Sequence, residues 1–284
     1  MPIDGLILSA DNIHKSRTVQ VRQVLKFDGF IVIDSGGFRM LSKNTTFDPQ
    51  EVIEWQKRAG DVDVLVVLDY PIEDGLSINE VRTRIEASIN NVAMWLDEFG
   101  PDKVMPVLHG RTRSAINFAK DLLFEKYGRV FKYIGIGSIA EVAKRNLPRM
   151  VDLARYIRKL LPNFHLHAFG CGGSSASILA AIGFDSADCS SHLVNSKYGL
   201  VMDPDTLHMC IITPLKKEER RPKITADELF ARCNCPVCKA RNYKISTWGK
   251  EGFILRAIHN AWNLSYMVKR KLVNPRWKKL LDYI

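Results

Sequence analysis

The chain has 284 residues, of which 46% are hydrophobic, and this is enough for one barrel-sized domain or two small ones. Its formal net charge is +10, and no apolar run approaches the roughly 18 residues that a membrane span needs. Residues 1–5 lack the basic and then apolar pattern of a secretion signal, so we expect a soluble, cytoplasmic protein.

The positive charge is concentrated in the last quarter of the chain. Residues 214–284 contain 17 Lys and Arg against 6 Asp and Glu, including Lys216 and Lys217, whereas residues 1–213 are close to neutral. We therefore predict a body over residues 1–213 and a basic lobe over residues 214–284. The asymmetry favours a nucleic-acid partner, and a solvated basic segment without a partner is the alternative.

Six apolar runs, most of them separated by helical patterns, end at a polar residue or a glycine. They are 30–33 before Asp34, 64–68 before Asp69, 104–108 before His109, 133–136 before Gly137, 166–169 before Gly170 and 186–187 before Asp188. Helical periodicity covers 49–58, 79–99, 113–127, 148–161 and 174–182, and 207–213 is expected to be one more strand. Repeated strand–helix units predict parallel strands in an α/β fold. We favour a (β/α)8 barrel of the TIM type over an open doubly wound sheet, because polar residues follow several different strands.

The first of these strand ends continues into a glycine pair, Gly36 and Gly37. Glycine lets the backbone approach a ligand closely because it has no Cβ. The segment lacks the lysine and spacing of a phosphate-binding loop and the third glycine of a dinucleotide fingerprint. A strand-to-helix turn capped by Asp34 is the structural alternative.

Three cysteines within six residues indicate a metal site. Cys233, Cys235 and Cys238 precede His259, which lies near the start of a helix expected over about residues 251–271. Three thiolates and one imidazole form a closed tetrahedral site, which is typical of structural zinc. Reduced cysteines packed as small hydrophobic residues fit less well, because their neighbours are polar. His165 and His167 are a second metal candidate on one side of a strand, although we favour partly buried structural histidines there.

In combination these segments resemble the tRNA-guanine transglycosylase superfamily, over about residues 29–271. The resemblance is carried by 34–38, Asp69, Gly137, 184–189 and the CxCxxC segment with His259. It implies a barrel with a zinc-bearing insertion near its C-terminal end, and exchange of a guanine in a polynucleotide for a 7-deazaguanine. By position, Asp188 resembles the nucleophile, Asp34 the general acid/base and Asp69 the residue that recognises the base. The chemistry agrees, because a carboxylate can trap the positive charge at C1′ while a second carboxylate moves the proton.

The resemblance also implies a set of contacts to the base: Ser35, Gly36, Gly37, Phe38, His109, Gly110, Gly137 and Ser138. Two of these positions depart from the family pattern, since His109 stands where glutamine is usual and Gly137-Ser138-Ile139 stands where Gly-Gly-Leu is usual. After Asp188, residues 189–199 replace the family's proline- and arginine-containing loop, which faces the nucleic acid.

The length and the altered loop make the chain similar to the 7-deazaguanine DNA transglycosylases of phages and bacterial genomic islands. We therefore expect DNA rather than tRNA as the polymer and a base such as 7-cyano-7-deazaguanine; a homodimer is compatible with this. A tRNA-guanine transglycosylase is the alternative within the family. A metal-dependent hydrolase centred on His165 and His167, or a nucleic-acid-binding module without catalysis, are the alternatives from other classes.

Overall fold

The computed structural model describes residues 4–13, 19–43, 45–214 and 220–283, so Lys216 and Lys217 lie outside the described residues. Contacts divide the chain into two compact units. We call residues 4–169 and 182–187 the sheet unit, and residues 170–181 and 188–283 the C-terminal unit. A domain boundary between residues 213 and 214 stays a prediction.

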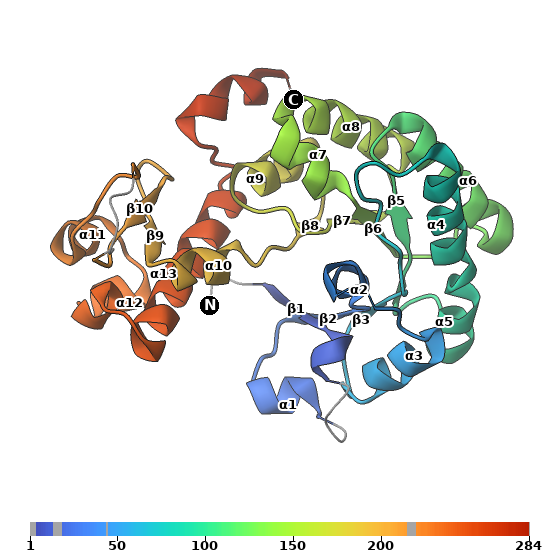
Figure 1. Cartoon of the computed structure of the whole chain (residues 1–284), viewed down its shortest axis with the longest axis horizontal. Helices are drawn as coiled ribbons and strands as arrows, with labels where there is room; N and C mark the ends of the chain where they lie inside the picture. Colours follow the sequence, from blue (N-terminus) through green and yellow to red (C-terminus); the bar gives the residue numbers. More distant parts are fainter. Residues whose placement is uncertain (1–3, 14–18, 44, 215–219, 284) are drawn as a thin grey trace. The chain divides into compact units, whose positions relative to one another are not determined.

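The sheet unit contains two four-stranded parallel sheets, and the strands of each sheet are in chain order (Figure 1). The first sheet consists of β1 (Gly5–Ser9), β2 (Phe30–Asp34), β3 (Val64–Val66) and β4 (Val104–Met105). The second is β5 (Val107–His109), β6 (Tyr133–Gly137), β7 (His165–Ala168) and β8 (Ser186–Ala187). Only Pro106, which has no N–H for the ladder, separates β4 from β5, and its carbonyl accepts the N–H of Gly135 at 2.9 Å.

This strand order confirms an α/β fold with parallel strands. An open doubly wound sheet reverses its strand order at a switch point, whereas the pairs here follow the chain without reversal. Strand β1 was not predicted, because Gly5 to Ser9 is short and only partly buried.

The helices of the sheet unit begin at recognisable capping residues. Asp48 accepts the N–H of Gln50 at 2.7 Å ahead of α3, and Ser77 forms a reciprocal capping box with Glu80 ahead of α4. The predicted helix over residues 79–99 divides at Asn91 into α4 and α5. The helices are α1 (Val21–Leu25), α2 (Gly37–Lys43), α3 (Pro49–Lys57), α4 (Ile78–Asn90), α5 (Val92–Phe99), α6 (Arg113–Tyr127), α7 (Ile139–Arg145) and α8 (Leu147–Leu160), with the 3-10 turn η1 (Ala10–Asn12).

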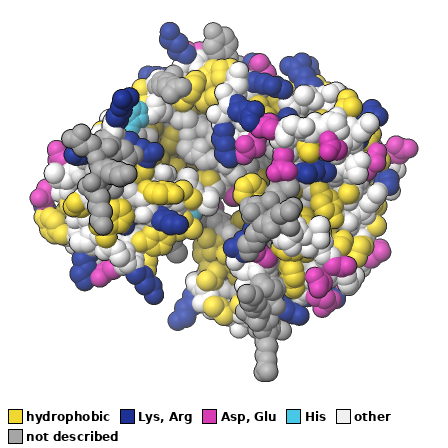
Figure 2. All heavy atoms as spheres, in the orientation of Figure 1, with side chains coloured by type: hydrophobic (Ala, Val, Ile, Leu, Met, Phe, Trp, Pro, Cys, Tyr) yellow, Lys and Arg dark blue, Asp and Glu magenta, His cyan; other side chains and the backbone are white. Residues whose placement is uncertain are grey.

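One face of the strands carries a continuous apolar cluster, formed by Val32, Val64, Val66, Met105, Val107 and Tyr133. Because side chains alternate along a strand, Asp34 and His109 point to the same face as this cluster, two residues beyond Val32 and Val107. The pattern therefore places polar side chains where the apolar filling of this face ends. On the side of the molecule in Figure 2, Asp and Glu side chains gather mainly over the helices of the sheet unit.

The C-terminal unit is built around α13 (Lys250–Lys269), close to the helix predicted over about residues 251–271. Asn260 on α13 accepts the N–H of Met202 at 2.8 Å and donates to the carbonyl of Leu200 at 3.0 Å, which fixes β9 (Leu200–Met202) to the helix. The strand predicted over residues 207–213 exists as β10 (Met209–Ile211), but it pairs antiparallel with β9 and not with the parallel strands. The other elements are α9 (Gly173–Ile182), whose last residue belongs to the sheet unit, α10 (Ser191–Lys197), α11 (Ala226–Arg232), α12 (Pro236–Lys239), η2 (Tyr243–Ser246) and η3 (Pro275–Tyr283).

Within the described ranges, none of the helices is both long and apolar enough to cross a membrane.

Candidate active site and metal centre

A chain of hydrogen-bonded side chains joins the carboxyl ends of four strands in the sheet unit. Ser35 donates from Oγ to Oδ1 of Asp69 at 2.8 Å, and Nε2 of His109 lies 2.7 Å from Oδ2 of the same carboxylate. The other ring nitrogen of His109, Nδ1, lies 3.1 Å from Oγ of Ser138. These residues follow β2, β3, β5 and β6, so the carboxyl ends of the strands bring together residues that are up to about a hundred positions apart.

Burial restricts the movement of these hydrogen-bonded side chains. Ser35 is fully buried, His109 is 2% exposed and the Asp69 side chain is 12% exposed. Each Asp69 oxygen receives one partner, and a carboxylate oxygen has two lone pairs. Asp69 can therefore accept further hydrogen bonds from a ligand at its exposed edge while Ser35 and His109 hold it in place.

Two glycines leave space for the hydrogen-bonded side chains of Asp69 and His109. A Cβ on Gly37 would lie 2.5 Å from the carbonyl oxygen of Asp69 and 2.8 Å from its Oδ1. A Cβ on Gly137 would lie 2.3 Å from Cε1 of the His109 ring. Gly37 and Gly137, both predicted base contacts, thus make room within the protein for the Asp69 carboxylate and the His109 imidazole.

The remaining predicted base contacts have different surroundings. Gly36 adopts a positive φ of 87°, which turns the chain from β2 into α2, and Gly110 stands where a Cβ would lie 2.8 Å from the backbone nitrogen of Ile116. Phe38 is 69% exposed on the first turn of α2 and takes no part in the chain of hydrogen bonds. Phe38 is therefore available to an external partner.

The two predicted catalytic aspartates belong to different units. Asp34 closes β2, is partly buried and accepts the N–H of Gly36 at Oδ2, 3.2 Å away. Asp188 follows β8 directly, is partly buried and accepts the N–H of Gly170 at Oδ1, 2.9 Å away. Both carboxylates are held by a backbone N–H at one oxygen.

Sequence reasoning missed a group that supports the glycine turn. Ser9, at the end of β1, donates to Asp11 at 2.6 Å, and Asp11, which is 6% exposed, forms an ion pair with Arg39 of α2. Ser9 pairs with Asp34 in the register of β1 and β2. The apolar run at Ile7 and Leu8 was the available signal, but it is too short to stand out.

The predicted metal ligands form a compact buried cluster in the C-terminal unit. Nδ1 of His259 lies 3.7, 3.4 and 3.4 Å from the sulfurs of Cys233, Cys235 and Cys238. A tetrahedral ion with Zn–S bonds of about 2.3 Å and a Zn–N bond of about 2.0–2.1 Å places sulfur and nitrogen roughly 3.6 Å apart. The cluster therefore fits a structural zinc ion with four protein ligands.

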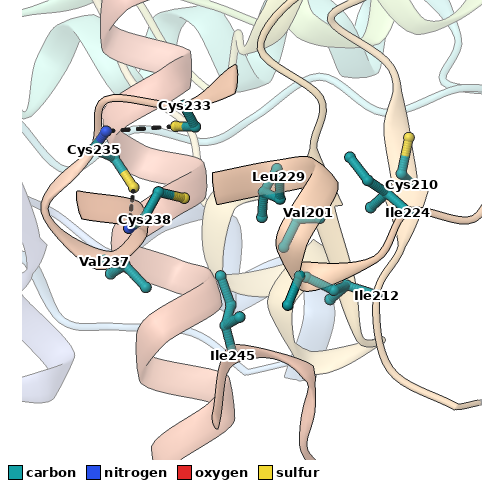
Figure 3. Packing of buried hydrophobic residues seen from close by; sticks show 11 residues of the cluster. Val201, Cys210, Ile212, Ile224, Leu229, Cys233, Cys235, Val237, Cys238 and Ile245 are labelled. Atoms are coloured by element: carbon teal, nitrogen blue, oxygen red, sulfur yellow. Dashed lines mark hydrogen bonds between the residues drawn. The ribbon is translucent and has the colours of Figure 1, made fainter. Parts of the chain in front are cut away.

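Surrounding groups orient these ligands. Nε2 of His259 lies 2.8 Å from the carbonyl of Met202, so it donates there and leaves Nδ1 for the metal. The backbone N–H groups of Cys235 and Cys238 point at the preceding cysteine sulfurs, as the dashed lines in Figure 3 show. Hydrogen bonds among the three thiols lower the pKa of Cys233 and raise that of Cys238, because the neighbouring sulfurs share one negative charge. Figure 3 also shows the apolar side chains beside the cysteines, among them Leu229, Val237 and Ile245.

The second metal candidate has another arrangement. Nε2 of His165 and Nδ1 of His167 each lie 2.9 Å from the hydroxyl of Ser186 on the neighbouring strand β8. Burial lowers the pKa of His165, which keeps its ring neutral at pH 7. Among the described residues, the only group of three or more potential ligands that could hold a metal is the Cys3His cluster. The geometry thus favours structural histidines at 165 and 167.

The chain is similar in sequence to known proteins over most of its length. The chain is 28% identical over 251 residues to the tRNA-guanine(15) transglycosylase of Methanopyrus kandleri, which covers 83% of this chain and 50% of that protein. It is 26% identical over 269 residues to the enzyme of the same name from Korarchaeum cryptofilum, covering 90% of this chain and 42% of the relative. The chain thus spans about half the length, or less, of these curated relatives. The queuine tRNA-ribosyltransferase family matches residues 7–271, which include every residue of the candidate active site and the metal centre, and the chain belongs to this family.

Proposed function

We propose that the protein exchanges a guanine in a polynucleotide for a 7-deazaguanine. Membership of the family supports this reaction, and the observation that carries it is the buried, hydrogen-bonded series Ser35–Asp69–His109–Ser138 at the ends of parallel strands. A buried carboxylate fixed by two neighbours is an acceptor that a flat base with adjacent N–H groups can satisfy.

Asp188 is the proposed nucleophile. Its carboxylate attacks C1′ of the target nucleotide, the C1′–O bond forms, and the glycosidic bond breaks with its electron pair moving to the guanine nitrogen. Asp34 in its acid form gives the departing guanine a proton. The resulting Asp34 carboxylate then removes the ring N–H proton of the incoming 7-deazaguanine, whose nitrogen attacks C1′ and releases Asp188.

Asp69 is the proposed reader of the base. A guanine-like edge offers N1–H and an exocyclic amine as two parallel donors, and a carboxylate accepts both. Adenine has no donor at N1, so it would leave part of this poorly exposed carboxylate unpaired. His109, Gly110, Gly137 and Ser138 are the proposed neighbours of the base on the side of β5 and β6, and Ser35, Gly36, Gly37 and Phe38 on the side of β2.

The polymer is a separate part of the proposal. We favour DNA, because residues 189–199 differ from the loop that faces tRNA in the family, and a base in a duplex would have to be flipped out of the stack. The names of the relatives, which are tRNA-guanine(15) transglycosylases, favour tRNA as the second candidate.

The ordered parallel strands with one apolar face also support our proposal that the strands close into a (β/α)8 barrel. A homodimer stays a prediction that sedimentation analysis can test.

The test is to incubate the protein with DNA and with tRNA, each containing labelled guanine, and a 7-deazaguanine base. We expect release of the label from DNA and a protein–polynucleotide adduct that resists denaturation. Asp188→Asn should abolish both, whereas Asp205→Asn, which removes an exposed carboxylate of the same unit, should change neither. Full exchange by Asp188→Asn would refute the nucleophile assignment. Exchange on tRNA alone would identify tRNA, and not DNA, as the substrate polymer.

A further inference from the structure

A pocket outside the predicted base contacts is rich in arginine. It has a volume of about 250 Å³ and is lined by Asp74, Arg111, Val142, Arg145, Asn146 and Arg149. All six residues belong to the sheet unit. Three guanidinium groups face one carboxylate, so the pocket carries two uncompensated positive charges.

The contacts inside the pocket leave most of its donors available. Asp74 uses one carboxylate oxygen for Arg111 and the other for Arg145. Arg149 donates from Nη2 to the carbonyl of Arg111 at 3.1 Å. Each arginine thus uses one terminal nitrogen, and its other terminal nitrogen has no partner among the described residues. Guanidinium groups with free N–H pairs are the protein groups best suited to bidentate contact with phosphate oxygens.

The pocket lies at the same ends of the strands as the proposed base site. Arg111 follows His109 by two residues, so their Cα atoms are at most about 7 Å apart. Asp74 lies in the loop that leaves Asp69, and Arg145 ends the helix α7 that begins directly after Ser138. Asp74, Arg111 and Arg145 thus lie in the segments that directly follow Asp69, His109 and Ser138.

The size and chemistry of the pocket limit its ligand. A volume of 250 Å³ is below the range of roughly 300–1,000 Å³ typical of pockets for whole small molecules. The side chain of Arg145 is 64% exposed and that of Asp74 is 43% exposed, so the pocket opens to solvent. An open, small and positively charged pocket suits one phosphate group of a larger molecule.

We propose that Arg111, Arg145 and Arg149 bind a backbone phosphate of the polynucleotide whose base is exchanged. This inference rests on the proposed function, because it takes the substrate of that reaction as the source of the phosphate. The pocket fixes the position of the strand beside the base site, and it contributes affinity that falls with salt.

The test compares two double variants that each remove two positive charges. Arg145→Gln/Arg149→Gln alters the pocket, whereas the control Arg155→Gln/Lys159→Gln alters two exposed residues of α8 outside it. Binding of a labelled DNA duplex and of a labelled tRNA is measured over a series of salt concentrations. We expect the pocket variant to bind its polymer about tenfold more weakly and to lower the slope of log K against log salt by about one, with little change in the control.

Equal binding by the two double variants would overturn the proposal. A second measurement, competition by guanosine monophosphate and by inorganic phosphate, identifies the source of the phosphate group. If the pocket variant loses affinity for the nucleotide but keeps its affinity for the polymer, the ligand of the pocket is the phosphate of a free nucleotide and not a backbone phosphate. These readouts are binding constants, so they stand even if the wild-type protein exchanges no base. Conversely, normal exchange with an unchanged KM in the pocket variant would refute the pocket alone.

Discussion

Nε2 of His109 lies 2.7 Å from Oδ2 of Asp69, and this contact determines how the imidazole presents its other nitrogen. Nδ1 of His109 lies 3.1 Å from the hydroxyl oxygen of Ser138, and this hydroxyl also lies 3.5 Å from the carbonyl of Ile72. The Ser138 oxygen in turn accepts the N–H of Ile72 at 3.3 Å. The orientation of His109 thus depends on a serine that directly follows the strand β6.

Replacement of Ser138 by alanine is expected to lower kcat/KM for base exchange about tenfold. The change removes the hydroxyl that holds Nδ1 of His109, and a lost hydrogen bond to a buried group costs about 1–3 kcal/mol. Steady-state exchange kinetics measure the loss, and a Ser138→Ala protein with wild-type kinetics would contradict this role.

The matched variant is Ser138→Gly, which also lacks the hydroxyl. Ser138 has a φ of 64°, a left-handed conformation that costs a residue with a Cβ roughly 1–2 kcal/mol. The glycine variant should therefore lose activity as the alanine variant does but be more resistant to thermal unfolding. Equal stability of the two would argue against strain at this position.

Replacement of Gly137 by alanine is expected to displace the His109 ring and to reduce exchange by two orders of magnitude or more. The new methyl group would stand 2.3 Å from the ring, and the buried imidazole, which is 2% exposed, has little room to move. Gly100→Ala is the control, since a Cβ there meets nothing within 4 Å and only its φ of 72° is strained. The control should lose about 1–3 kcal/mol of stability through this backbone strain and keep its activity.

Replacement of Cys238 by serine is expected to abolish stoichiometric zinc binding and to destabilise the C-terminal unit. The wild-type protein should contain one zinc per chain, because the four ligands form one closed tetrahedral set. Elemental analysis and limited proteolysis measure the two effects. Cys210→Ala, which changes a buried cysteine of the same apolar cluster that is not a ligand, should retain the zinc.

The sequence was a good guide wherever one strand or one motif was sufficient. The run before Asp34 is a strand, the run over 64–68 contains a strand over 64–66, and the run over 104–108 is divided at Pro106 into β4 and β5. The spacing of the cysteines identified the metal cluster, because these three ligands are neighbours in the chain. The helix over 79–99 was less accurate, since nothing in its periodicity showed that Asn91 would end α4.

Contacts between residues that are far apart in the sequence could not be predicted from local sequence patterns. That Asp69 lies between Ser35 and His109 follows from the order and register of β2, β3 and β4, and from the continuation of β4 into β5 after Pro106, which no local pattern contains. The antiparallel pairing of β10 has the same cause. Residues 209–211 have the composition of a strand, but their partner is β9, and the choice of partner is a tertiary property.

Acidification is expected to destabilise the protein partly through His165. Burial, together with His167, Lys132 and Arg158, lowers the pKa of His165 from 6.5, and Asp185 opposes this. The unfolded chain therefore binds the proton more readily, and the stability conferred by the neutral ring is lost as pH falls below about 6.5 towards the folded pKa. In the variant His165→Gln, the dependence of the unfolding free energy on pH should weaken by up to about 1.4 kcal/mol per pH unit in this window. Urea denaturation over about pH 5 to 8 measures it, and the exposed His208 supplies the control His208→Gln.

Asn263 is expected to set the zinc affinity although it is not a ligand. Its Nδ2 lies 3.4 Å from the sulfur of Cys233 and 2.9 Å from the carbonyl of His259, one turn earlier on α13, so one amide group holds two ligand residues. Asn263 is 5% exposed, and water is therefore poorly placed to replace it. Replacement by leucine, which has a similar volume, should lower the affinity for zinc about 10–100-fold, as is usual when a partner of a metal ligand is removed. Competition with a chelator of known affinity measures the change.

Asn260→Leu is the informative comparison, because Asn260 is equally buried on the same helix but contacts Leu200, Met202 and Ser196 and not the cysteines. It should reduce stability through the loss of these contacts while the metal affinity of the folded protein changes less. Equal losses of affinity in both variants would contradict a role that is specific to Asn263.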